Sequence, residues 1–136
     1  MRRTLLALAG VAATVLVIAS VATAALIIGT PGPDVLGGTT AADTIYGKAG
    51  NDRIMGRGGP DLLYGNADSD RMGGGQGRDT LFGNLGDDVL YARADDGARD
   101  YLNCGPGWDA AYIRGNDIAI GCEVVNFVTS GDDEAV

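Results

Sequence analysis

The chain has 136 residues, enough for one modest domain, and contains 23 glycines but no histidine. Its 18 acidic residues outnumber 10 basic ones, and the net charge of −8 disfavours nucleic acid and anionic membranes as partners. Without histidine the chain lacks His-dependent catalytic triads and most zinc sites, whereas its acidic excess suits hard cations that bind oxygen ligands.

The N-terminal segment has the three parts of a secretory signal peptide. Met1–Arg3 is basic, Leu5–Val21 is apolar, and Ala22–Ala24 has the A-x-A pattern that precedes signal cleavage. We therefore expect a cleaved signal helix over residues 1–24 and a secreted, extracellular chain that begins at Ala25. An uncleaved segment that anchors the protein at the cell surface is the alternative, because the apolar run continues past the cleavage site. Cleavage removes two arginines, which leaves 8 basic against 18 acidic residues and a net charge of −10.

The segment from Gly29 to Tyr91 repeats with a period of nine residues. Each unit reads G-x-x-G-x-D-x-U-x, where U is apolar, and only Ala41 and Asp68 replace the second glycine. Self-similarity at a fixed period indicates a repeat architecture. The repeated aspartates are Asp34, Asp43, Asp52, Asp61, Asp70, Asp79 and Asp88, and each is followed two places later by Leu36, Ile45, Ile54, Leu63, Met72, Leu81 or Leu90.

This unit resembles the nonapeptide of the repeats-in-toxin (RTX) family, G-G-x-G-x-D-x-U-x, which residues 74–82 match in full. The resemblance implies an all-β fold over residues 25–91, a parallel β-roll or β-solenoid. In such a roll each nonapeptide forms a loop and a short strand, and two nonapeptides make one coil. The resemblance also implies calcium as the cofactor, bound between loops of successive coils by aspartate carboxylates and backbone carbonyls.

The residue chemistry agrees with such a roll. One apolar side chain per unit would face inward, so the core is thin and each coil depends on its neighbours. Aspartates stacked about 4.8 Å apart would repel one another unless a cation lies between them. Two units per coil sort the repeated aspartates into two columns, with gaps for about five calcium sites. The columns are Asp34, Asp52, Asp70 and Asp88 on one edge, and Asp43, Asp61 and Asp79 on the other.

The same spacing predicts an outward aromatic ladder. Tyr46, Tyr64 and Phe82 are 18 residues apart at the ninth position of the unit. Cross-strand packing accounts for such a ladder, and stacking against carbohydrate is the alternative.

After Tyr91 the nine-residue phase breaks. Ala92–Ala94 behaves as a three-residue insertion, after which Asp100 and Asp109 extend the two columns. We expect residues 92–128 to be degenerate repeats that cap the roll, followed by an acidic tail over residues 129–136.

Two cysteines lie within this predicted cap. Cys104 and Cys122 are 18 residues apart, which is one coil in the repeat geometry, so their Cα atoms should lie within disulfide range. In an oxidising compartment we expect a disulfide that closes the end of the roll, and the alternative is two free buried thiols.

Together these features predict a non-enzymatic, secreted, monomeric protein that folds around several calcium ions. The alternative is an extracellular adhesion or carbohydrate-binding module on the same calcium-stabilised scaffold, with a polysaccharide or a cell surface as its partner. An enzyme is disfavoured because too few residues lie outside the repeats to form a catalytic domain.

Overall fold

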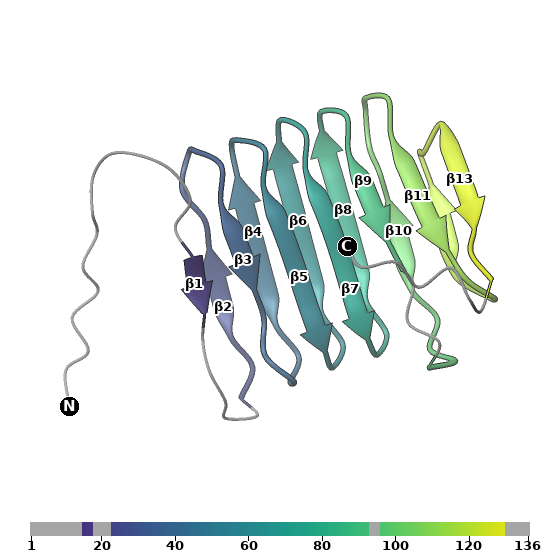
Figure 1. Cartoon of the computed structure of the whole chain (residues 1–136), viewed down its shortest axis with the longest axis horizontal. Helices are drawn as coiled ribbons and strands as arrows, with labels where there is room; N and C mark the ends of the chain where they lie inside the picture. The colour runs from purple at the N-terminus through teal and green to yellow at the C-terminus, as the bar shows by residue number, and fades with distance from the viewer. Residues whose placement is uncertain (1–14, 18–22, 93–95, 130–136) are drawn as a thin grey trace.

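The computed structural model describes residues 15–17, 23–92 and 96–129, and these form a parallel β-solenoid (Figure 1). Nothing helical in this described part of the chain is long and apolar enough to cross a membrane. The strands are β1 (Val15–Val17), β2 (Leu26–Ile28), β3 (Val35–Gly37), β4 (Thr44–Lys48), β5 (Arg53–Gly58), β6 (Leu62–Ala67), β7 (Arg71–Gln76), β8 (Thr80–Leu85), β9 (Val89–Tyr91), β10 (Tyr101–Asn103), β11 (Ala110–Ile113), β12 (Ile118–Ile120) and β13 (Val124–Phe127).

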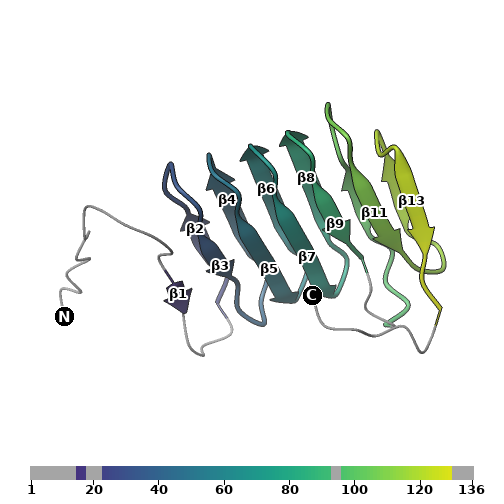
Figure 2. The ribbon, with the colours of Figure 1, turned by 45° about the horizontal axis from the view of Figure 1, so that its top comes forward.

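The strands alternate between two parallel sheets. Odd-numbered strands form one sheet in the order β1-β3-β5-β7-β9-β11-β13, and even-numbered strands form the other in the order β12-β10-β8-β6-β4-β2. Successive coils therefore lie side by side along one axis, as Figure 2 shows. Ile45 pairs with Leu63 and Leu63 with Leu81, which confirms a coil of two nonapeptides.

The core is one column of apolar side chains per sheet, between the two sheets. Every predicted inward residue is at most 3% exposed, because side chains alternate between the two faces of a strand. The column extends beyond the repeats to Ile27 at one end and to Leu102 and Ala111 at the other. The predicted β-roll is therefore confirmed.

The first coil begins before the first recognised repeat. Leu26–Ile28 forms β2, which pairs in parallel with β4. Of the predicted signal helix, Val15–Val17 is described as strand β1, which pairs with β3, and Thr23 and Ala24 are described without regular structure. The rest of that prediction, residues 1–14 and 18–22, lies outside the described residues.

The coils change length after Tyr91. Leu81 pairs with Leu102, an offset of 21 that agrees with a three-residue insertion. The next offsets are 17, from Leu102 to Ala119, and 14, from Ala111 to Val125. The last coils shorten at their turns: between β11 and β12 the chain reverses in a tight turn that contains Gly115 and is closed by an Asp117 N–H to Arg114 carbonyl bond.

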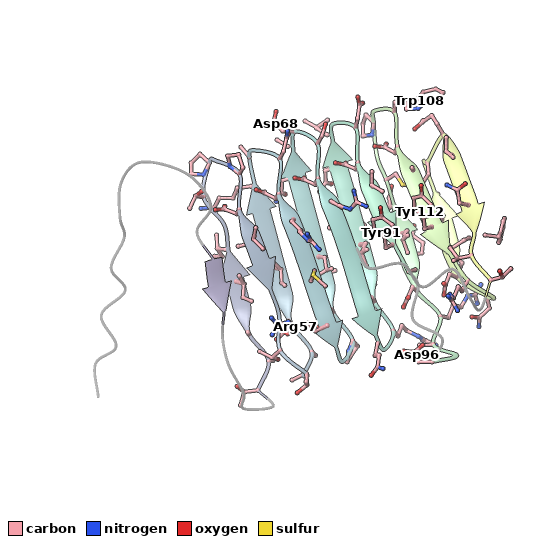
Figure 3. The ribbon with its side chains drawn as sticks, viewed as in Figure 1. Arg57, Asp68, Tyr91, Asp96, Trp108 and Tyr112 are labelled. Carbon is pink, nitrogen blue, oxygen red and sulfur yellow. A yellow bond between two sulfur atoms is a disulfide. The ribbon has the colours of Figure 1, made fainter. Side chains whose placement is uncertain are left out.

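The predicted aromatic ladder is present on the outer face of the even-numbered sheet. The ring centroids of Tyr46 and Tyr64 are 4.7 Å apart, and those of Tyr64 and Phe82 are 5.1 Å apart, with nearly parallel planes. A second stack was not predicted: Tyr91 and Tyr112 stack at 4.9 Å on the odd-numbered sheet (Figure 3). Tyr91 and Tyr112 are 21 residues apart, the offset that the three-residue insertion gives Asp79 and Asp100, so applying that offset to the ninth position of the unit would have found this stack.

Candidate metal sites

The loops that carry the aspartates fold tightly against the next coil. A Cβ atom added at Gly47 would lie 2.4 Å from Asp52 Oδ2 and 2.7 Å from the carbonyl oxygen of Gly65. No real side chain tolerates such distances, so the first position of this unit must be glycine. The space beside it is thereby left to two oxygens, one from a carboxylate and one from the backbone.

Lys48 and Arg57 stand where the family pattern has its second glycine. Both keep a positive φ of 84°. A left-handed conformation costs a residue with a Cβ atom about 1–2 kcal/mol. The loop shape is therefore maintained at these positions against local strain.

The aspartates form the two predicted columns, and from Asp43 onward one carboxylate oxygen of each aspartate accepts a backbone N–H of the preceding coil. The N–H of Asp52 donates to Oδ1 of Asp70 at 2.8 Å, and the N–H of Asp61 donates to Oδ1 of Asp79 at 2.9 Å. The same bond links each of the pairs Asp34–Asp52, Asp70–Asp88, Asp88–Asp109, Asp43–Asp61 and Asp79–Asp100. All nine predicted site residues thus lie in the columns and are at most 4% exposed.

The columns continue further than the sequence indicated. The N–H of Asp100 donates to Oδ1 of Asp117 at 3.0 Å, and that of Asp109 donates to Oε2 of Glu123 at 2.7 Å. Sequence reasoning missed both acceptors because it kept an 18-residue coil, whereas these bonds span 17 and 14 residues. Allowing the coil to shorten after Cys104 would have found them.

The second carboxylate oxygen is unsatisfied in most of the repeats. Oδ2 is buried without a hydrogen-bond partner in Asp52, Asp61, Asp70, Asp79, Asp88 and Asp109. A buried carboxylate oxygen without a partner is costly unless a proton or a cation reaches it. These six oxygens are therefore suited to bind a cation.

Asp34 and Asp43, the first aspartates of the two columns, have hydrogen-bond donors for Oδ2 within their own loops. Oδ2 of Asp34 accepts bonds from the backbone N–H of Thr30 at 2.5 Å and from its hydroxyl at 3.0 Å. Thr39 gives Asp43 the same two bonds. Both threonines occupy the second position of the unit, and such hydroxyl–carboxylate loops are a local alternative to an external ligand. The N-terminal loops are therefore the least dependent on a cation.

Electrostatics in the columns oppose ionised carboxylates. The pKa of Asp70 is raised from 3.8 to about 7, chiefly by burial and also by the neighbouring charges of Asp88 and Asp52, although the hydrogen bond from the Asp52 N–H lowers it. Burial likewise raises the pKa of Asp61 to about 7 and that of Asp79 to about 8. A bound cation would therefore stabilise the ionised carboxylates most in the middle of the roll, where these aspartates lie.

The donor set fits calcium when backbone oxygens are included. Within the described residues, no three or more carboxylate or cysteine side chains group closely enough to hold a metal by themselves. The Gly47 position shows what completes the set, since a carboxylate Oδ2 and the carbonyl of the next coil border one space. Calcium takes carboxylate and backbone carbonyl oxygens in flexible geometry, whereas zinc prefers nitrogen and sulfur.

Other acidic residues brace the loops. Exposed Asp68 accepts a bond from the N–H of Gly50 at 2.9 Å, and exposed Asp96 accepts one from Gly77. Figure 3 places Asp68 and Asp96 on opposite edges of the roll. Asp68 therefore compensates for the glycine that its unit lacks by holding the preceding coil.

Cys104 and Cys122 form a disulfide, with Cα atoms 5.2 Å apart. The predicted pairing is correct, although its geometry is one residue out of register. Asn103 pairs with Ile120, so the coil here has 17 residues and Cys122 lies one residue past the position equivalent to Cys104. The bridge joins the end of β10 to the residue pair that follows β12.

Comparison with known proteins agrees with this geometry. The family model for the RTX calcium-binding nonapeptide repeat, which spans four copies, matches residues 28–63, 46–81 and 64–97. Neither curated proteins nor solved structures gave a match. RTX repeats bind calcium in general, and the matched residues include every loop with an unsatisfied Oδ2 except that of Asp109. The stacked loops, the two aspartate columns and this match over half of the sequence show that the chain belongs to the RTX calcium-binding repeat family.

Proposed function

We propose that this protein is a secreted calcium-binding protein whose roll closes as its aspartate columns acquire calcium. The observation that carries the proposal is the set of six buried aspartate Oδ2 atoms without a hydrogen-bond partner. Calcium would supply positive charge and accept several oxygen donors at once. The carboxylates of Asp52, Asp70 and Asp88 on one edge, and of Asp61 and Asp79 on the other, would hold it together with loop carbonyls.

Folding and binding should be coupled because the core is thin. Each coil buries one apolar side chain per strand, while each loop brings carboxylates together. At low calcium the repulsion between carboxylates should outweigh this burial, and the repeats should expand. Extracellular calcium modules typically have dissociation constants on the order of 10⁻⁴ to 10⁻³ M, which suits a chain that must stay unfolded until export.

A calcium titration followed by far-ultraviolet circular dichroism tests the proposal. We expect a gain of β signal with calcium, reversed by a chelator, and a smaller gain with magnesium, which requires a stricter octahedral geometry. Isothermal titration then counts the ions. A chain whose signal is the same in chelator and in calcium would contradict the proposal.

The remaining parts of the proposal concern organisation. Residues 1–24 would direct export and be removed, residues 25–91 would form the calcium roll, residues 92–128 would cap it, and residues 129–136 would form an acidic tail. The disulfide between Cys104 and Cys122 supports an oxidising compartment. We propose no catalytic activity and a monomeric state.

The carbohydrate-binding alternative gains nothing from the aromatic ladder. A sugar stacks on the face of an aromatic ring, but the faces of Tyr46, Tyr64 and Phe82 lie against one another. Tyr46 and Tyr64 stack with an interplanar angle of 3°, so the ring face that each presents to the other is not open to a sugar. Cross-strand packing accounts for the ladder, and a polysaccharide or cell-surface partner stays an untested prediction.

A further inference from the structure

Ala25 stands at the head of the second aspartate column. Its backbone nitrogen donates to Oδ1 of Asp43 at 2.7 Å, across 18 residues. Asp43 makes the equivalent bond to Asp61 at 2.8 Å in the next coil. Ala25 therefore occupies an aspartate position of the repeat, but its methyl group brings no carboxylate to share a cation with Asp43.

The carboxylate of Asp43 is buried, with 2% of the residue exposed. In the described part of the unprocessed chain, its hydrogen-bond donors other than Ala25 are the N–H and the hydroxyl of Thr39, both of them neutral. A buried carboxylate is stabilised far better by a charged donor than by neutral ones. Thr39 satisfies the hydrogen bonding of this carboxylate without adding charge, so a charged donor in place of the neutral Ala25 N–H would stabilise it further.

The bond before Ala25 is placed where cleavage can occur. Thr23 and Ala24 are exposed and have no regular structure, while β2 begins at the residue after Ala25. Hydrolysis of the Ala24–Ala25 bond places the hydroxide of water on the Ala24 carbonyl carbon and hydrogen on the Ala25 nitrogen. That nitrogen takes a further proton and becomes an α-ammonium at the atom that already contacts Asp43.

We propose that the α-ammonium of Ala25 is a built-in cation that caps the second aspartate column, so that export processing completes the N-terminal end of the roll. The inference rests on the proposed export and cleavage. It assigns the Ala24–Ala25 bond a structural purpose beyond release: cleavage one residue earlier or later would move the charge away from Asp43. The charged contact also holds the start of β2, whose neighbour Thr44 donates its N–H to the Ala25 carbonyl.

The test begins with the full-length chain in a secreting host. Mass spectrometry of the exported protein should identify Ala25 as the first residue. Selective acetylation of its α-amine then removes the charge and keeps the N–H donor. With calcium present, we expect hydrogen exchange at the amide of Thr44 to become about 10-fold faster after acetylation, as for loss of one charge-assisted bond. Exchange at the Tyr101 amide, three coils further along the same sheet, should not change.

Two variants separate the contact from general damage. In Asp43→Asn, acetylation should have no effect on the Thr44 amide. In a chain that keeps Ala24 as its first residue, the Thr44 amide should exchange as fast as in the acetylated protein, with Asp43 intact. Equal exchange rates before and after acetylation of the wild-type chain would overturn the inference, as would cleavage at another bond. The gain of β signal with calcium is measured on the same samples and reports the proposed function separately.

Discussion

Replacing Asp70 with asparagine should stabilise the metal-free roll while weakening its response to calcium. Asp70→Asn keeps an oxygen that can accept the Asp52 N–H and removes the charge on the buried, unsatisfied Oδ2. At pH 7 the ionised form of Asp70 opposes folding, because burial raises its folded-state pKa from 3.8 to about 7. One pKa unit corresponds to about 1.4 kcal/mol, so the whole shift would destabilise the folded state by about 4 kcal/mol. Solvent screening at the loop edge reduces this, and we expect Asp70→Asn to increase the free energy of unfolding by about 1–2 kcal/mol.

The assay is chemical unfolding followed by circular dichroism, in chelator and in calcium, with an osmolyte series if the metal-free chain is only partly folded. Asp34→Asn is the matched comparison, since it stands in the same column but its Oδ2 is bonded by Thr30. Asp34→Asn should destabilise the metal-free chain because it removes an acceptor. If Asp70→Asn were less stable than wild type in chelator, the buried charge would not oppose folding. If calcium increased the stability of Asp70→Asn as much as that of wild type, Asp70 would not be a calcium ligand.

Three further predictions concern pH, the disulfide and the ladder. Burial raises the folded-state pKa of Asp52 to about 6 and that of Asp79 to about 8, above the ordinary value of 3.8, so protonation of these aspartates stabilises the folded chain. This stabilisation is lost as the pH rises through 6–8. In chelator, the β signal should therefore be stronger at pH 5 than at pH 8. Replacing Cys104 and Cys122 with alanine opens a link across 18 residues and should cost about 3 kcal/mol, seen as a lower thermal midpoint in calcium; an unchanged midpoint would mean that the bridge does not constrain the cap. Tyr64→Ala removes two stacked contacts and should lower the free energy of unfolding by about 1–3 kcal/mol. A loss below about 0.5 kcal/mol would show that the ladder does not stabilise the fold.

The sequence predicted the repeated part of the molecule well because one period controls everything there. The nine-residue spacing determines which side chain faces inward, so the sequence alone assigns Ile45, Leu63 and Leu81 to the core, where they are buried. The same spacing determines which aspartates stack, and it gave both columns. Those are consequences of strand alternation and of two units per coil.

The ends of the roll were harder because their contacts do not share that period. Asp117 and Glu123 join the columns through coils of 17 and 14 residues, and the nine-residue repeat predicts neither length. The role of Thr30 and Thr39 was also hidden, since a threonine in the second position looks like a poor match to the family pattern. Only the bonding of the carboxylate distinguishes a degraded loop from one with its own internal donor.

The alternation of strands between two sheets also limits how such a chain can change length. Removing 18 residues from the repeats would bring the remaining coils into register, with both carboxylate columns and the Tyr46, Tyr64 and Phe82 ladder preserved. Removing nine would transfer every later unit to the opposite sheet. The aromatic rings would then meet the side that carries Arg53 and Arg71, and each aspartate would move to the other edge. Duplication and loss during evolution should therefore proceed by pairs of nonapeptides, and a natural or engineered relative with an odd number of inserted units should fold poorly.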